Sequence, residues 1–158
     1  MLRRSSHSVW DCRYHLVWAT KRRRKALKFE GERAYCEKLL RRVAEKYDMF
    51  VAAIAVDEDH VHMYVEIPPQ LSVGAAVRAF KSLSARYMLK RYPYLKRYFW
   101  AGPFWSPSYF VRSVGEGVTA ETVRRYIKTH DEEGEPGPVQ ADLFPRRPPK
   151  RKKGSAGP

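Results

Sequence analysis

The stretch DEDHVHMYVEIPP, residues 57–69, decides the fold. Its centre alternates apolar with polar side chains, which is the pattern of a β-strand buried on one face. The apolar members are Val61, Met63, Val65 and Ile67. The two prolines that follow end the strand, because proline cannot donate to the hydrogen bonds of a sheet. If the strand begins by His60, the imidazoles of His60 and His62 project from the same face.

Two histidines on one strand face could share a cation, but a chance pair on a solvent face would look the same. A third ligand from another element would separate these interpretations. The segment ETVRRYIKTHDEE, residues 121–133, offers one, since Tyr126 and His130 lie one helical turn apart with Cβ atoms ~6 Å apart. Tyr126 could be a nucleophile, although a hydroxyl with a free pKa of ~10 needs activation. Alternatively, Tyr126 packs in the apolar stripe of the helix and His130 is a favourable charge near its end.

The residues around this strand predict the order β-α-β-β-α-β-α. A strand, a helix and a strand precede it, at Cys12–Thr20, Glu32–Tyr47 and Met49–Val56. A helix capped by Ser72 that runs to Arg91, a strand at Phe104–Val114 and a helix from Thr119 through His130 follow it. The first six elements match an α+β, ferredoxin-like β-α-β-β-α-β sandwich with an antiparallel sheet, to which a C-terminal tyrosine-bearing helix is added. We expect His62, Tyr64 and Glu66 on the open face of the sheet.

The 158 residues predict one folded domain, residues 1–133, and a basic Pro/Lys/Arg-rich tail, residues 134–158, that we expect to be disordered. The net charge is +14, from 31 Lys and Arg against 17 Asp and Glu. Without the tail, 25 basic residues still face 15 acidic ones. The predicted domain is therefore basic itself, which favours a nucleic-acid partner over the alternative, an anionic membrane surface.

Basic side chains on a loop and on helix faces suit contacts to phosphates. The candidates are Lys21, Arg22, Arg23, Arg24, Arg78 and Lys81. Four aromatic residues could either stack on unpaired bases or belong to the core: Trp18, Tyr98, Trp100 and Trp105.

The lack of an apolar targeting segment, together with only two cysteines, favours a cytoplasmic protein. No apolar run approaches the ~18 residues of a membrane span, and the start MLRRSSHSVW lacks the apolar segment of a signal peptide. We therefore expect no membrane association, and free thiols at Cys12 and Cys36.

Three segments together resemble a known family. DEDHVHMYVEIPP, FWSPSYFVRSVG and VTAETVRRYIKTH, in this order and spacing, are similar to the small single-tyrosine HUH transposases of minimal bacterial and archaeal insertion sequences, the superfamily of REP-associated tyrosine transposases. YHLVWATKRRR in the first strand resembles their N-terminal stretch, so the resemblance covers roughly residues 8–133. His-hydrophobic-His alone is a weak signal, and the three segments together are a strong one.

This resemblance implies a DNA transposase that cleaves and rejoins single-stranded DNA at element ends marked by hairpins. His60 and His62 would bind one divalent cation, Mg²⁺ or Mn²⁺, and Tyr126 would form a 5′-phosphotyrosine link. The family usually carries a glutamine as third ligand where this chain has His130, a ligand that favours Mn²⁺, Co²⁺ or Zn²⁺ over Mg²⁺. The resemblance further implies a homodimer with possible trans active sites, in a prokaryotic cytoplasm and at the nucleoid when bound to DNA.

Other functions remain open at this point. A domesticated relative that processes hairpins in its host genome would carry the same residues. A ferredoxin-like nucleic-acid-binding module without chemistry would carry stacking aromatics on its sheet, where this chain has histidines. A relaxase or replication initiator shares the HUH chemistry, but such proteins are usually larger.

Overall fold

The structure is a computed structural model, and it describes residues 2–100 and 102–115. The predicted tyrosine helix, with Tyr126 and His130, and the predicted tail 134–158 lie outside the described residues. The domain boundary at residue 133 therefore stays a prediction.

The described strands and helices follow the predicted order as far as the fourth main strand. The strands are β1 (Arg3–Arg4), β2 (Val9–Trp10), β3 (Arg13–Ala19), β4 (Phe50–Val56), β5 (His60–Glu66) and β6 (Phe110–Ser113). The helices are η1 (Lys21–Arg23), α1 (Glu30–Lys46), α2 (Val73–Arg91), η2 (Pro93–Leu95) and α3 (Lys96–Phe99). The small β1–β2 hairpin and the turns η2 and α3 were not predicted, because such short elements carry no periodic pattern.

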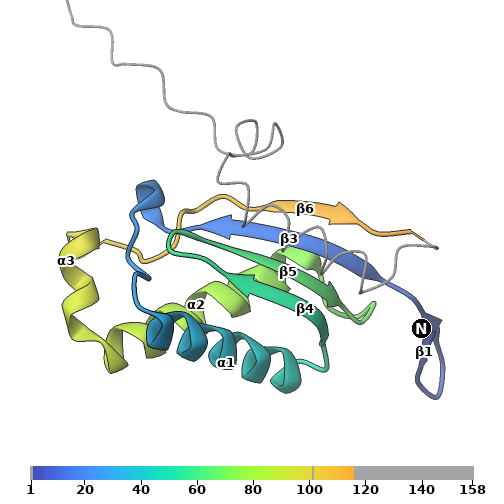
Figure 1. Cartoon of the computed structure of the whole chain (residues 1–158). Coiled ribbons are helices and arrows are strands. Elements are labelled where there is room, and N and C mark those ends of the chain that lie inside the picture. Colours follow the sequence, from blue (N-terminus) through green and yellow to red (C-terminus); the bar gives the residue numbers. More distant parts are fainter. Residues whose placement is uncertain (1, 101, 116–158) are drawn as a thin grey trace, which may run out of the picture.

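The main sheet has four strands in the order β4-β5-β3-β6, and every neighbouring pair is antiparallel. This arrangement confirms the predicted ferredoxin-like fold. Strand β5 lies inside the sheet and pairs with β3 over seven residues, from Arg13 opposite Glu66 to Ala19 opposite His60. Helices α1 and α2 lie side by side and cover one face of the sheet (Figure 1).

The sequence fixes where both long helices begin. The Oγ of Ser72 accepts a hydrogen bond from the Ala75 backbone N–H at 3.1 Å, which confirms the predicted cap of α2. At the start of α1, the carboxylate of Glu32 accepts from the Phe29 backbone N–H at 3.1 Å. Each cap satisfies an amide that has no partner inside its helix.

The core lies between the helices and the sheet face that carries Val61, Met63 and Val65. The rings of Trp18 and Phe80 stack with centroids 6.0 Å apart, and Trp105 meets Trp18 edge-on. Trp105 also donates its Nε1–H to Ser84 Oγ at 2.9 Å. Trp18 and Trp105 are thus core residues, and neither offers its ring as a stacking surface for bases.

The predicted fourth strand, Phe104–Val114, is shorter than expected, since β6 covers only Phe110–Ser113. Pro107 has no N–H for the ladder and lies in the part that is not a strand. The preceding residues instead pair with the backbone at the end of β3 and just beyond it. Ser106 N–H donates to Ala19 O, and Lys21 N–H donates to Phe104 O, both at 2.9 Å.

The expectation of an open second sheet face is wrong, because all seven residues of β5 are buried. Tyr64 packs with Ala53 and Val114 on this face. Glu66 accepts an ion-paired hydrogen bond from Arg3 of strand β1 at 2.7 Å. Periodicity correctly indicates which residues share a face, but it cannot show that Arg3 of the N-terminal hairpin and Val114 contact that face.

The stacked pair of Trp18 and Phe80 gives a direct test of this core. Phe80 is fully buried on α2, so Phe80→Ala should lower the free energy of unfolding by about 3–5 kcal/mol, through lost burial and a cavity. Tyr87→Ala, on the exposed side of the same helix, is the matched control and should cost about 0.5 kcal/mol. Urea unfolding followed by circular dichroism measures both, and equal losses would contradict this packing.

Candidate functional site

The two histidines of β5 lie together on the sheet face that the helices do not cover. Their ring centroids are 4.8 Å apart, with the planes nearly perpendicular, and His60 and His62 are only 6% and 8% exposed. In the neighbouring strands, His62 lies opposite Val17 and Ala55. These neighbours offer no polar group to the imidazole, so its polar partners must come from other positions.

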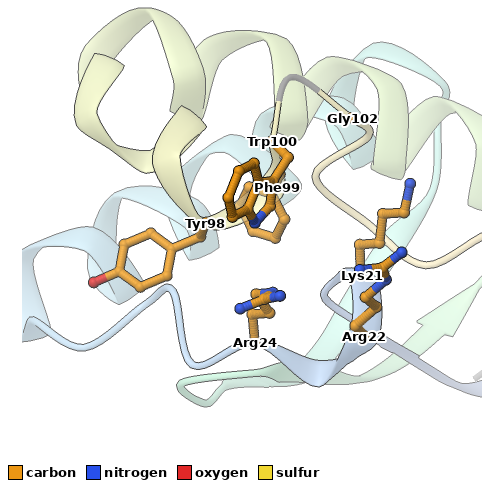
Figure 2. A pocket seen from close by; sticks show the side chains of 7 residues that line it. All are labelled: Lys21, Arg22, Arg24, Tyr98, Phe99, Trp100 and Gly102. Atoms are coloured by element: carbon orange, nitrogen blue, oxygen red, sulfur yellow. The ribbon is translucent and has the colours of Figure 1, made fainter.

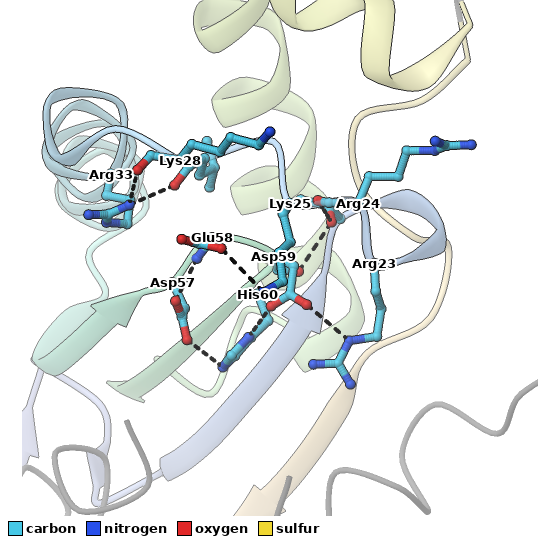
Figure 3. Close-up of polar contacts among 11 residues, drawn as sticks. Arg23, Arg24, Lys25, Lys28, Arg33, Asp57, Glu58, Asp59 and His60 are labelled. Carbon is cyan, nitrogen blue, oxygen red and sulfur yellow. Dashed lines mark hydrogen bonds and ion pairs between the residues drawn. The ribbon is translucent and has the colours of Figure 1, made fainter. Parts of the chain in front are cut away.

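The carboxylate of Asp59 is hydrogen-bonded to one nitrogen of the His60 ring (Figure 3). Its Oδ1 is 2.6 Å from Nδ1 of His60, and because a carboxylate can only accept, Nδ1 carries the proton. Burial alone would raise the pKa of Asp59, but the hydrogen bond to His60 and the charge of Arg23 keep it below its usual value. Asp57 Oδ2 lies 3.8 Å from the other ring nitrogen, Nε2.

His15 of β3 faces the ring of His62. Its Nε2 lies 3.4 Å from Nδ1 of His62, and the two rings are stacked with centroids 5.6 Å apart. Burial first, and the charge of Arg112 second, hold the pKa of His15 below its usual value, which favours a neutral ring that can accept one hydrogen bond. Nδ1 of His62 is thus the ring nitrogen directed at His15.

The donor set at this end of β5 fits a divalent cation. His60 and His62 can each present a neutral Nε2, and oxygen donors lie beside them. Asp57, Asp59 and His60 each offer a ligand atom within 4.8 Å of the others. Mixed imidazole and carboxylate ligands suit Mn²⁺, Co²⁺ and Zn²⁺.

Sequence reasoning underestimated two residues of this site. Neither Asp59 nor His15 is among the sequence-predicted site residues, yet both contact the β5 imidazoles. Glu66, which shares the sheet face of His62, pairs with Arg3 instead. A polar ring at His15, directly before the apolar run Leu16–Ala19, is the available sequence signal. Only the strand register shows which histidine it meets.

The basic segment after β3 contacts the turn that precedes His60 through an ion pair and hydrogen bonds. Arg23 lies 3.4 Å from Oδ2 of Asp59, and Thr20 Oγ1 donates to the backbone oxygens of Arg24 and Asp59. Lys21 and Arg22 belong to η1, and both Arg22 and Arg24 are exposed. The candidate phosphate-binding residues 21–24 thus lie next to the candidate metal centre.

The two basic candidates on α2 differ from one another. Arg78 is exposed, beside a groove of about 550 Å³ between α2 and residues 102–109. Lys81 is half-buried, and its ammonium group donates to the backbone oxygens of Ser106 at 2.6 Å and Ser108 at 2.8 Å. Lys81 therefore connects two parts of the chain, and its charge is less accessible to a phosphate than that of Arg78.

An antiparallel ferredoxin-like sheet with a His-x-His pair on an inner strand is the arrangement expected of the small single-tyrosine HUH transposases, which the sequence resembles. The chain belongs to the IS200-like transposase family, since the family described as "Transposase IS200 like" matches residues 8–130. The match covers the four-stranded sheet and both long helices, and it extends over the segment with Tyr126 and His130.

Two transposases are similar to this chain over most of their length. The ISDra2 transposase TnpA of Deinococcus radiodurans is 38% identical over 127 residues, which are 79% of this chain and 89% of that protein. The transposase of insertion sequence IS200 from Salmonella typhimurium is 33% identical over 143 residues, covering 90% of this chain and 92% of the other.

Two solved structures share the fold. A crystal structure of a candidate transposase from Deinococcus radiodurans superposes with a TM-score of 0.66 at 33% identity, covering 83% of this chain and 96% of that one. A REP-associated tyrosine transposase bound to a REP hairpin gives a TM-score of 0.51 at 13% identity, covering 84% and 74%. The second likeness concerns the fold alone.

Within the described part of the chain, no helix combines the length and the apolar character needed to cross a bilayer.

The position of Lys81 predicts a specific dependence of stability on pH. Burial lowers the pKa of Lys81 from 10.5 to about 8, so between these pH values the unfolded chain binds more protons at this residue than the folded chain. The free energy of unfolding should then rise with pH across that interval. Urea titrations should show wild type gaining stability relative to Lys81→Met between pH 8 and 10, and no change between pH 6 and 7.5. A constant difference at all pH values would contradict the lowered pKa.

Proposed function

We propose that this transposase cuts and rejoins single-stranded DNA at hairpin-marked ends of an insertion sequence, through a 5′-phosphotyrosine at Tyr126. The observation that carries the proposal is the pair of β5 imidazoles. The two rings lie with centroids 4.8 Å apart on one face of the sheet, and Asp59 and His15 contact the Nδ1 atoms of His60 and His62. Such outer partners orient metal-binding histidines in many proteins.

The proposed reaction exchanges phosphodiester bonds in two steps. The hydroxyl oxygen of Tyr126 attacks a phosphorus atom of the strand, a phosphotyrosine bond forms, and the bond from phosphorus to the 3′-oxygen breaks. The 3′-oxygen leaves and takes up a proton. A second 3′-hydroxyl can then attack the phosphotyrosine, restoring the DNA backbone and the free tyrosine. No external energy source is needed, because the covalent intermediate conserves the phosphodiester bond energy.

His60, His62 and His130 would hold the cation, either Mg²⁺ or Mn²⁺. A bound divalent ion polarises the phosphate and stabilises the departing oxygen. With a histidine at position 130, we expect Mn²⁺ to support activity better than Mg²⁺ does. Asp59 and His15 act as positioning residues, since each fixes the orientation and the protonated nitrogen of a ligand ring.

The DNA partner follows from the charge and from the relatives. Lys21, Arg22 and Arg24 place positive charge beside the metal centre, and Arg78 adds exposed charge on α2. The related REP-associated transposase binds a REP hairpin, which supports a hairpin substrate here. We also propose a homodimer in the bacterial or archaeal cytoplasm, in which the tyrosine helix can serve the histidines of its own chain or those of its partner.

The phosphotyrosine can be detected directly. Mixing the protein with labelled, hairpin-bearing single strands and Mn²⁺ should give a labelled protein band that survives boiling in SDS. Tyr126→Phe should abolish this band, because it removes the attacking oxygen, and a chelator should abolish it as well. Tyr87→Phe is the matched control, since it removes a hydroxyl from an exposed tyrosine on α2, and should leave the band unchanged.

Two results would contradict the proposal. A band that persists in Tyr126→Phe would assign the nucleophile to another residue. Absence of a band, with tight and salt-sensitive binding of the same strands, would instead indicate a nucleic-acid-binding protein without strand-transfer chemistry.

A further inference from the structure

A hollow between η1 and the end of α3 is lined by basic and aromatic side chains (Figure 2). We call it the Trp100 notch, and its main lining residues are Lys21, Arg22, Arg24, Tyr98, Trp100 and Gly102. None of them is acidic. Its volume is about 190 Å³, below the ~300 Å³ at which pockets for drug-sized ligands begin. A hollow of this size suits a single ring system.

Trp100 is unusual for a tryptophan of a folded domain, because 83% of it is exposed. By comparison, Trp18 and Trp105 are 0% and 4% exposed. Trp100 contacts no other aromatic ring among residues 2–99 and 102–115, and its backbone is left-handed, with φ at 48°. That conformation is disfavoured for a residue with a bulky side chain. The exposed ring therefore contributes little to the core and is available to a ligand.

The basic run after β3 divides into two groups. Arg23 and Lys25 each face a carboxylate, Asp59 at 3.4 Å and Glu58 at 3.5 Å. Lys21, Arg22 and Arg24 line the notch, and these three make no ion pair with any residue that the structure describes. The uncompensated positive charge is thus concentrated beside the Trp100 ring.

Backbone contacts hold the two walls of the notch together. Lys21 N–H donates to Phe104 O at 2.9 Å, and Gly102 N–H donates to Phe99 O at 2.7 Å. A Cβ at Gly102 would lie 2.9 Å from Phe99 O and 3.0 Å from the ammonium nitrogen of Lys21, so only glycine fits there without displacement. An aromatic surface beside cations, on a backbone held by these contacts, suits an unpaired base and its phosphates.

We propose that the Trp100 notch binds one unpaired nucleotide of single-stranded DNA. The base stacks on the indole of Trp100, and the flanking phosphates meet Lys21, Arg22 and Arg24. The inference rests on the proposed function, which it deepens by assigning a contact to the DNA strand. Thr20 Oγ1 donates to the backbone oxygens of Arg24 and Asp59, so the same turn holds the notch and the residue that orients His60. A strand held in the notch therefore lies beside the candidate metal centre.

Binding of two simple oligonucleotides tests the base contact. The probes are a fluorescein-labelled dT8 strand and an abasic strand of the same length and charge, both measured by fluorescence anisotropy with the full chain at low salt. Wild type should bind dT8 about 10-fold more tightly than the abasic strand, the order of one base–aromatic stack. Trp100→Ala should reduce dT8 affinity to the abasic level and leave abasic binding unchanged. Trp100→Phe should keep most of the preference, and Tyr87→Ala should keep all of it.

The phosphate contact has a separate readout. Lys21→Gln should reduce the slope of log affinity against log salt by about 0.7, the contribution of one phosphate contact on a single strand. Lys38→Gln removes the same charge from the exposed side of α1 and should leave the slope unchanged. If both variants had the same slope of log affinity against log salt, Lys21 would not make the proposed phosphate contact.

The possible outcomes separate the inference from the proposed function. If dT8 binds in a salt-sensitive manner but Trp100→Ala keeps the full preference for bases, the notch assignment is wrong and DNA binding stands. If the wild-type protein binds neither strand, both fail together. Because Trp100 is so exposed, the variant should unfold at the wild-type urea concentration, and this confirms that a loss of binding is local.

Discussion

The antiparallel pairing of β5 with β3 is the constraint on which the candidate site depends. Its register sets His62 opposite Val17, which brings His15, two residues earlier in β3, against the His62 ring. A slip of one residue would reverse every side chain of β5 and turn both histidines toward the helices. The apolar residues Val61, Met63 and Val65 prevent such a slip, because it would bring them out of the core. The hydrophobic core therefore fixes the geometry of the polar site on the opposite face.

The turn before β5 connects this site with the basic surface. Asp59 contacts His60 with one carboxylate oxygen and Arg23 with the other, and its backbone oxygen accepts from Thr20. Arg23 thus serves mainly to position Asp59. The neighbouring basic residues are directed outward, toward the hollow beside Trp100. One short turn thus joins the candidate cation ligands to the candidate contacts for DNA.

Much of the fold could be predicted, because its long elements have clear periodicity. The alternation after His60, the apolar stripe of α1 and the Ser72 cap each have a local physical cause. The resemblance to a transposase family rested on three spaced segments, and the family match supports it. The sequence could not show that Trp100 is exposed while Trp105 is buried, nor that Asp59 contacts His60. Such facts depend on contacts between segments far apart in the chain. The roles of Tyr126 and His130 remain predictions, since both lie outside the described residues.

The central claim is that His60 and His62 present their Nε2 atoms to one divalent cation. Long-range ¹H–¹⁵N correlation spectra of the full chain, with isotope-labelled histidine and added Zn²⁺ as a diamagnetic probe, measure this directly. The account predicts Nδ1-protonated rings for both residues, and at one equivalent of Zn²⁺ a large shift of their Nε2 resonances alone. His60→Ala and His62→Ala identify the signals. Coordination through Nδ1, or a spectrum in which neither histidine responds to the ion, would contradict the account.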